Sequence, residues 1–282
     1  MAADKGKQFE YSICLAAWKQ VGYANLSPTL QREYMKYDSL IEDEDVRQAG
    51  DIAINEIKKE ISNPQWLTFE SKAGRSKFGG EPKTDILFNG NIKVSVKWED
   101  KGWQLTSGNP RFTYETMANA LANSYEQGDM SLKDYDVIKM LIDSYDKAFS
   151  RVGTQVSKNI DSVLDRNQQL TKELSGVLGT GHKPGKIYEQ FNHAVVREAL
   201  TGEILFDGGV DAANYVLGNL SGFHKIDDKL VKVVAKYYKT RIASKKGRGK
   251  DKATGTRRNE IAGRMEITAS SILGLVNDIK RI

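Results

Sequence analysis

Apolar and polar residues follow two different rhythms in the first part of the chain. Apolar residues recur three or four positions apart in residues 5–21 and again in residues 43–62, which places them on one side of a helix. Two short β-prone runs follow in residues 84–88 and 92–98, separated by Asn89-Gly90-Asn91. An Asn-Gly pair between such runs is a strong signal for a β-hairpin. We therefore expect two helices followed by a hairpin.

The second run of the hairpin has the alternation of a strand with two different faces. Apolar residues occupy every second position from Ile92 to Val96, while Lys93, Ser95 and Lys97 take the positions between and after them. Residues 65–71, upstream of the hairpin, are also aromatic and β-prone. These three segments together predict a small β-meander between helices.

The second part of the chain has mostly helical patterns. Residues 176–185 contain four glycines and a proline and are predicted to be a linker, whereas residues 230–242 and 260–268 fit either a helix or a strand. We expect an α/β (α+β) fold, with a small mixed sheet flanked by helices in residues 1–125 and a largely helical region in residues 126–282 that can complete the same domain. Helical spacing extends over residues 131–150, 154–178, 186–200 and 210–219.

The composition excludes several classes of protein. The 282 residues are 39% hydrophobic and 28% charged, which is typical of a chain that buries its own core. Cys14 is the only cysteine, which excludes an internal disulfide and a thiolate cluster, and the three histidines are too scattered for a strong zinc signature. No apolar run near the start is as long as a signal peptide or the ~20 residues of a membrane span, so we expect neither. We expect a cytoplasmic protein of a bacterial or phage-infected cell, with no membrane partner.

Positive charge is concentrated in one glycine-rich segment. The whole chain has a formal charge of +5, yet residues 241–260 contain eight basic and two acidic residues, so the remaining residues sum to −1. We expect a flexible basic loop there that binds the phosphate backbone of a nucleic acid, although a solvated surface loop has the same composition. The basic residues of this loop are Arg241, Lys245, Lys246, Arg248, Lys250, Lys252, Arg257 and Arg258.

The hairpin also carries residues that suit metal-assisted hydrolysis. Asp85 begins the first strand, and Ser95 and Lys97 lie two positions apart on the second, so they share one face. The hairpin turn then brings Asp85 alongside them. Each motif alone has an ordinary explanation, since Asp85 could cap a turn and Ser95 and Lys97 could lie on a solvated face. A second acidic-x-Lys sequence, Glu70-Ser71-Lys72, has no aspartate at hairpin spacing before it and ranks lower.

Three sequence motifs, in this order, resemble a known family. Lys83-Thr84-Asp85-Ile86, Ser95-Val96-Lys97 and Gln104-Leu105-Thr106-Ser107-Gly108 resemble the PD-(D/E)XK (restriction-endonuclease-like) nuclease superfamily, in its restriction and phage-type subgroup with a Lys-Thr-Asp … Ser-x-Lys pattern. Gly6-Lys7-Gln8-Phe9-Glu10 is similar to the Gly-x-x-Phe-Glu opening of that family's first helix. The resemblance covers residues 5–108 in ordered pieces.

This resemblance implies a Mg²⁺-dependent endonuclease that hydrolyses DNA phosphodiester bonds, with Mn²⁺ as a substitute metal. Glu10, Asp85 and Glu70 would hold the metal, and Lys97 would orient the attacking water or stabilise developing charge. A homodimer is expected, because cutting two strands with one site per chain needs two chains. The implied catalytic set is Glu10, Asp85, Ser95, Lys97 and Gln104, and the implied DNA-binding set is Lys83, Lys245, Lys246, Arg248, Lys250, Arg257 and Arg258.

Ser95 departs from the parent pattern, which has an acidic residue there. A hydroxyl is a weaker metal ligand than a carboxylate, so Glu10 or Glu70 would have to supply the missing charge. One alternative is therefore a catalytically inactive DNA-binding or virion-associated structural protein that keeps the nuclease fold, and another is an all-α interaction protein. Trp98 and Trp103 flank the predicted site and fit base stacking, although a place in the core fits them at least as well.

Overall fold

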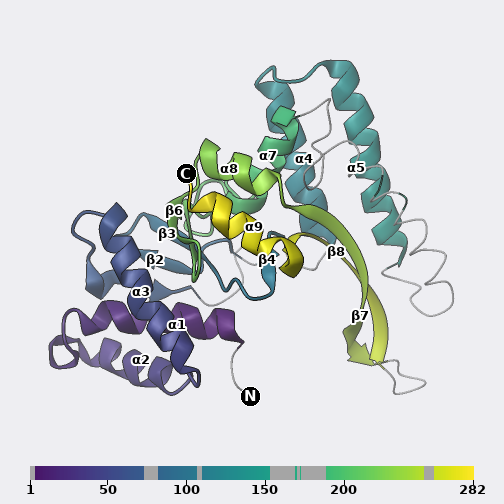
Figure 1. The fold of residues 1–282 in the computed structure, drawn as a ribbon. Coiled ribbons are helices and arrows are strands. Elements are labelled where there is room, and N and C mark those ends of the chain that lie inside the picture. The colour runs from purple at the N-terminus through teal and green to yellow at the C-terminus, as the bar shows by residue number, and fades with distance from the viewer. Residues whose placement is uncertain are drawn as a thin grey trace. The chain divides into compact units, whose positions relative to one another are not determined.

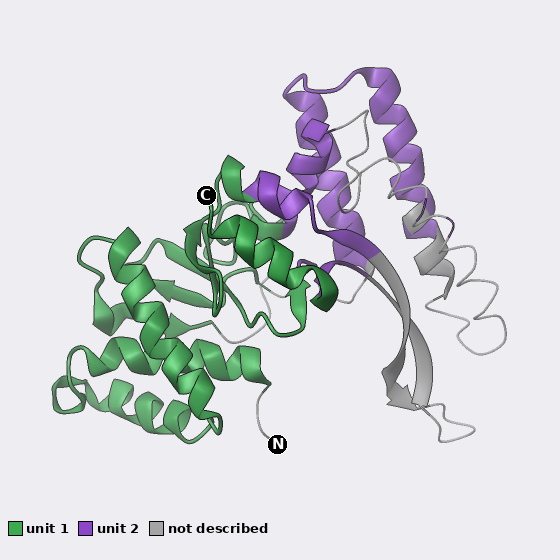
Figure 2. Ribbon diagram, viewed as in Figure 1, with its two compact units in different colours: residues 1–103, 200–230, 269–282 green, residues 104–199, 231–268 purple. Residues whose placement is uncertain are grey.

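The computed structural model describes residues 4–72, 82–106, 110–152, 169, 172, 189–250 and 257–282, and these form a mixed α/β structure. The chain divides into two compact units (Figure 2). Unit 1 comprises residues 1–103, 200–230 and 269–282, and unit 2 comprises residues 104–199 and 231–268. Unit 1 is discontinuous in sequence because late strands of the chain return to pair with the early hairpin.

A five-stranded mixed sheet forms the centre of unit 1. Its strands are ordered β1-β2-β3-β5-β6; β3 and β5 are parallel, and the other neighbours are antiparallel. Figure 1 labels β2, β3 and β6 of this sheet. The predicted hairpin is confirmed as β2 and β3, and both Asn89 and Gly90 in its turn have the positive φ that these residue types tolerate. The strands are β1 (Glu70–Ser71), β2 (Ile86–Phe88), β3 (Ile92–Lys97), β5 (Tyr215–Gly218) and β6 (Gly222–Lys225).

Three helices share one apolar core with this sheet. They are α1 (Lys5–Lys19), α2 (Pro28–Asp38) and α3 (Glu44–Glu60), so the predicted first and second helices are confirmed, and α2 is an additional one. The helices α1 and α3 contact strands of the sheet, and α2 packs on α1. Nearly every residue of α1 from Gln8 to Trp18 is buried, since α1 contacts α2, α3 and β3. Phe9 and Ile13 of α1 share the core with Val94 of β3.

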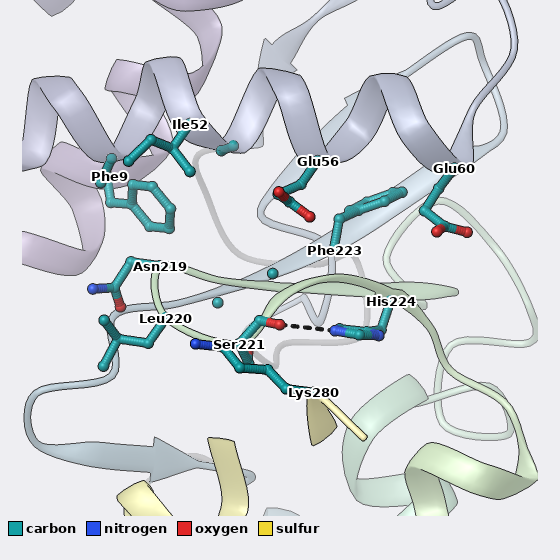
Figure 3. Close-up of a pocket in the computed structure, with 14 residues that line it drawn as sticks. Phe9, Ile52, Glu56, Glu60, Asn219, Leu220, Ser221, Phe223, His224 and Lys280 are labelled. Atoms are coloured by element: carbon teal, nitrogen blue, oxygen red, sulfur yellow. Dashed lines mark hydrogen bonds between the residues drawn. The ribbon is translucent and has the colours of Figure 1, made fainter. Parts of the chain in front are cut away.

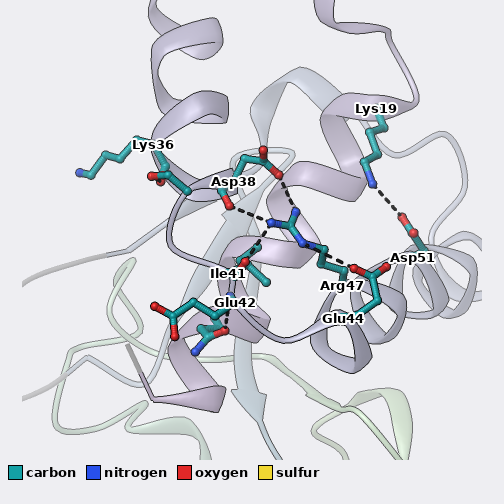
Figure 4. A network of polar contacts seen from close by, with 10 residues as sticks. Lys19, Lys36, Asp38, Ile41, Glu42, Glu44, Arg47 and Asp51 are labelled. Carbon is teal, nitrogen blue, oxygen red and sulfur yellow. Dashed lines mark hydrogen bonds and ion pairs between the residues drawn. The ribbon is translucent and has the colours of Figure 1, made fainter. Parts of the chain in front are cut away.

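Polar groups hold the ends of these helices. Asp4 caps α1 by accepting a hydrogen bond from the Lys7 N–H (3.0 Å). Arg47 of α3 joins the end of α2 to the connection that follows it (Figure 4). Its guanidinium forms an ion pair with the Asp38 carboxylate and donates to the carbonyl oxygens of Asp38 (2.8 Å) and Ile41 (2.9 Å). A single side chain therefore satisfies carbonyls that the helix end leaves open.

Unit 2 contains a helical pair and most of a second sheet. The helices α4 (Pro110–Glu126) and α5 (Leu132–Val152) pack against each other, and α7 (Glu189–Thr201) follows later in the chain. The second sheet has the order β4-β8-β7. Its strands are β4 (Gly102–Gln104), β7 (Lys239–Lys250) and β8 (Arg257–Thr268). The helices α8 (Asp228–Ala235) and α9 (Ala269–Ile279) complete the described chain, in which no helix is both long and apolar enough to cross a bilayer.

Two predictions for the second part of the chain are wrong. Residues 210–219 were expected to be helical, but β5 occupies 215–218, because its backbone pairs in parallel with β3. The basic segment 241–260 was expected to be a loop, but most of it belongs to β7 and β8, which pair as an antiparallel hairpin; residues 251–256 lie outside the described residues. Lysine and glycine are depleted in strands, so local propensity concealed this hairpin.

Other predictions for this region are confirmed or fall outside the described residues. The predicted helix at 131–150 is confirmed as α5, and the one at 186–200 is confirmed as α7. The predicted helix at 154–178 and the linker at 176–185 lie outside the described residues, apart from residues 169 and 172. The region after residue 126 is therefore less uniformly helical than its pattern suggested.

The close approach of α1 and α3 generates a stability prediction. A Cβ on Gly50 would lie 2.6 Å from Ser12 Oγ and 2.7 Å from the Ser12 backbone. We expect Gly50→Ala to lower the free energy of unfolding by about 1–3 kcal/mol, because the helices cannot move apart without disturbing the core. Helix propensity alone would raise it by about 1 kcal/mol. Urea unfolding measures the sign, with Gln48→Ala on the exposed side of α3 as the control; stabilisation by Gly50→Ala would contradict the packing argument.

Candidate active site

Asp85 lies directly before β2, at the point where pairing between β2 and β3 ends. Its backbone N–H donates to the Val94 carbonyl (2.8 Å), and its carbonyl accepts from the Lys72 N–H (2.7 Å). The carboxylate oxygen Oδ2 accepts from the Val96 N–H (2.7 Å) and from the Ser95 hydroxyl (3.4 Å). The Asp85 carboxylate thus accepts from an N–H group of β3 that a backbone carbonyl would accept from if β2 continued toward lower residue numbers.

The segment before Asp85 is tied to a distant part of the chain. The N–H groups of Lys83 and Thr84 both donate to the Asp211 carbonyl, at 2.7 and 3.2 Å. The Thr84 hydroxyl, which is fully buried, donates to the Ala212 carbonyl (2.9 Å). These three hydrogen bonds fix the two residues that precede Asp85. Lys83 is half-buried in this segment.

Glu10 comes to the same place from α1. Its side chain is 10% exposed, and its Oε2 atom accepts from the Ser71 hydroxyl (3.2 Å) of β1. Lys7, one turn earlier on α1, forms an ion pair with the same oxygen and donates to the Ser71 hydroxyl (3.3 Å). A helix residue, a strand residue and a lysine are therefore joined in one small polar network.

Glu10 and Asp85 lie within electrostatic reach of each other. Burial, with the neighbouring Asp85 carboxylate, raises the pKa of Glu10 to about 8, against the opposing effect of Lys7. Burial also raises the pKa of Asp85, while Lys97, the Val96 N–H, Lys7 and Ser95 act to lower it. Of the residues predicted from the sequence, the helix glutamate and the strand lysine therefore each interact with the hairpin aspartate.

Ser95 and Lys97 reach the cluster from β3. Ser95 is 4% exposed and donates to Asp85, so its hydroxyl orients the carboxylate. Lys97 ends β3 on the same face as Ser95, half-buried, and its charge acts on Asp85. Its carbonyl accepts from the Asn219 N–H (3.2 Å), which ties the end of β3 to the turn between β5 and β6.

Glu70 and Gln104 are placed differently from the predicted metal and catalytic sets. Glu70 forms an ion pair with Lys72 (2.7 Å), and half of its side chain is exposed. Neighbouring strand residues point to opposite faces, so Ser71, which contacts Glu10, takes the position expected for Glu70. Gln104 is exposed at the end of β4 and belongs to unit 2.

The remaining predicted residues lie outside the cluster. Trp98 is half-buried and makes an edge-to-face contact with Phe9 (centroids 5.6 Å apart), and Lys5 lies over its ring. Trp103 is 1% exposed, so the structure assigns it to the core. The predicted DNA-binding lysines and arginines between positions 245 and 258 lie in β7 and β8. Only the backbone of these strands is described at those positions.

Glu99 is a buried carboxylate that sequence reasoning missed. It is 1% exposed, and its two oxygens accept four hydrogen bonds. The N–H groups of Leu220 and Ser221 donate to Oε2 (2.7 Å each), while the Ser221 hydroxyl (2.7 Å) and Trp103 Nε1 (3.1 Å) donate to Oε1. Glu99 therefore holds the β5–β6 turn against the end of β3. No local pattern signals this role, because every donor but Trp103 is distant in sequence.

Unit 1 also contains a pocket of about 350 Å³ (Figure 3). Glu56 and Glu60 of α3 face the β5–β6 turn across it, where His224 Nε2 is hydrogen-bonded to the Ser221 carbonyl (2.9 Å). Glu56 already forms an ion pair with Lys59 (2.7 Å). The residues that line this pocket do not include Glu10, Asp85, Ser95 or Lys97. The carboxylate cluster, with its opposed charges, is the stronger candidate for chemistry.

The donor set of the cluster fits a divalent cation with few protein ligands. Within the described ranges, no three acidic, histidine or cysteine side chains converge. The buried Glu10 and the half-buried Asp85 nevertheless supply two carboxylates that repel each other, and a bound cation would relieve that repulsion. Mg²⁺ prefers such oxygens and is commonly held by one or two carboxylates, together with water and substrate phosphates. The residues present therefore fit this metal.

Comparison with known proteins returned no match. No family model fits the chain, and no curated protein and no solved structure is significantly similar to it. The likeness to the PD-(D/E)XK superfamily therefore remains a resemblance carried by the sequence motifs. The function of the chain has to be inferred from those motifs and from the geometry of the cluster.

Glu99 generates a second stability prediction. Glu99→Gln replaces one acceptor oxygen by an NH₂ group, which leaves buried donors of the β5–β6 turn without a partner. We expect the free energy of unfolding to fall by about 2–3 kcal/mol, the usual cost of such unpaired buried groups. The denaturant midpoint measures this change, with the exposed neighbour Asp100→Asn as the matched control. Equal midpoints for the two variants would contradict the role assigned to Glu99.

Proposed function

We propose that this protein is a Mg²⁺-dependent endonuclease that hydrolyses DNA phosphodiester bonds, of the restriction-like or phage-encoded type. The observation that supports the proposal is that Glu10 and Lys97, from a helix and a strand end, each lie within electrostatic reach of the Asp85 carboxylate. These residues come from a helix, a hairpin start and a strand end. Their positions match the three elements that the resemblance to the PD-(D/E)XK superfamily implies.

The roles of the residues follow from their contacts. When bound, Mg²⁺ neutralises phosphate charge and supplies a water of lowered pKa. Glu10 and Asp85 are the carboxylates that would hold it, and the Val96 N–H orients Asp85 (2.7 Å). Lys97 acts on Asp85 from the end of β3, where an ammonium can orient the attacking water or stabilise charge that develops on the phosphate.

Ser95 is compatible with activity in this arrangement. Its hydroxyl donates to Asp85 (3.4 Å) and thus positions a ligand instead of being one. The charge that an acidic residue would supply at position 95 comes from Glu10 on α1. The alternative that the serine suggests, an inactive DNA-binding protein, does not account for the repulsion between Glu10 and Asp85.

The first functional prediction concerns cleavage. Asp85→Asn removes a carboxylate and Lys97→Met removes the ammonium, so we expect each to slow nicking of supercoiled plasmid in Mg²⁺ by about 10²–10³-fold. Gel electrophoresis of timed samples measures the rate. Asp100→Asn and Lys101→Met are matched controls, since both residues are exposed in the following turn. Equal cutting by all of these proteins would show that the nuclease is a contaminant or lies elsewhere.

The second functional prediction concerns the basic hairpin of β7 and β8. Neutralising four of its basic residues to Gln should weaken binding to duplex DNA and flatten its dependence on salt, by about one unit of log–log slope per lost phosphate contact. Fluorescence anisotropy across a salt series without Mg²⁺ measures the slope. The residues changed are Lys245, Lys246, Arg248 and Lys250.

A charge-matched control separates a local contact from a general loss of positive charge. It replaces four exposed lysines that lie on helices away from the basic hairpin in sequence, and its slope should stay close to that of the unmodified protein. An equal loss of slope in both variants would remove the hairpin from the proposed DNA contacts. The control residues are Lys19, Lys36, Lys59 and Lys133.

A further inference from the structure

Lys7 occupies a position that neither the sequence motifs nor the proposed mechanism uses. Its ammonium forms an ion pair with Glu10 Oε2 and donates to the Ser71 hydroxyl (3.3 Å). The side chain is 28% exposed, so the contact is partly shielded from water. The backbone of Lys7 is fixed by the helix cap, since its N–H donates to Asp4. The ammonium, in contrast, sits at the end of a flexible four-carbon stem.

The charge of Lys7 faces both carboxylates of the cluster. It acts on Glu10 by direct contact, and it also acts on Asp85, whose charge in turn acts on Lys7. A divalent cation held by Glu10 and Asp85 would meet this ammonium at close range. Two positive charges against one carboxylate oxygen repel each other strongly in a poorly hydrated place. The ammonium and the metal therefore compete for Glu10.

We propose that Lys7 is the resident cation of the Glu10–Asp85 site and that a divalent cation binds by displacing its ammonium from Glu10. This inference rests on the metal-dependent function proposed above and specifies how the site accepts its metal. Tyr11, one turn further along α1, offers the displaced group a second position, because Lys7 Nζ already lies 5.4 Å from the centre of its ring. Lysine can thus move between a carboxylate and an aromatic face without disturbing the helix.

Calorimetric titration with Mn²⁺ tests the exchange without measuring cleavage. Lys7→Met keeps the stem and removes the charge, so we expect its Kd for Mn²⁺ to fall about tenfold, because the like charge beside the metal is gone. Lys5→Met is the matched control, as Lys5 lies on the same helix end but pairs with Asp43. It should bind Mn²⁺ as the unmodified protein does. Glu10→Gln should lose binding.

The outcomes separate this inference from the proposed function. Equal or weaker Mn²⁺ binding by Lys7→Met, with Glu10→Gln still impaired, overturns the exchange and leaves the metal site standing. Absence of Mn²⁺ binding in every protein, the unmodified one included, overturns both the exchange and the metal-dependent function. Tighter binding by Lys7→Met and Lys5→Met alike would show a general charge effect and would also overturn the exchange.

A second measurement uses the unmodified protein and does not depend on any variant folding. Lysine acylation followed by mass spectrometry reports how accessible each ammonium is. We expect Lys7 to react slowly without metal and severalfold faster with saturating Mg²⁺, while Lys5 reacts at one rate in both conditions. An unchanged rate for Lys7 would show that its ammonium stays on Glu10 and would overturn the exchange.

Discussion

The Asp85 carboxylate replaces a piece of backbone in the β2–β3 ladder, and the rest of the site depends on that substitution. Pairing of β2 with β3 ends at Ile86, and the next free N–H on β3, that of Val96, is taken by Asp85 Oδ2. A side chain held in this way cannot turn into solvent. It is therefore fixed at the edge of the sheet, within electrostatic reach of Glu10 and Lys97, where its charge has to be balanced by neighbours.

Unit 1 contains two ways of burying a carboxylate, and they have different consequences. Glu99 accepts four hydrogen bonds, which satisfy both of its oxygens and fasten the β5–β6 turn to β3. Glu10 and Asp85 instead repel each other and depend on lysines at their margin. A buried carboxylate whose oxygens are all hydrogen-bonded is structural, whereas perturbed carboxylates that depend on nearby charges are typical of functional sites.

The helix α1 links this chemistry to the stability of the unit. Its apolar residues fill the core between α3 and the sheet. Lys7 and Glu10, near the start of α1, face the end of the β2–β3 hairpin where Asp85 lies. The tight contact of Gly50 with Ser12 sets how closely α3 can press on α1. A carboxylate on such a helix stays in place, because any shift of α1 would disturb the whole core.

Local sequence patterns were sufficient for the elements whose structure depends on near neighbours. Helical periodicity located α1, α3, α5 and α7, and the Asn-Gly turn located the β2–β3 hairpin. Strand alternation also placed Ser95 and Lys97 on one face. Glu10 was identified because the motif around it resembles the start of the first helix in a known family.

Tertiary structure decided everything that depends on distant partners. The segment at 215–218 becomes a strand because β3 offers it a free edge, and the basic segment becomes a hairpin because β7 and β8 satisfy each other's backbone. The choice of Ser71 instead of Glu70, and the position of Lys7 on Glu10, follow from how α1 lies against β1. Such contacts join residues far apart in the chain, so no pattern of neighbouring side chains encodes them.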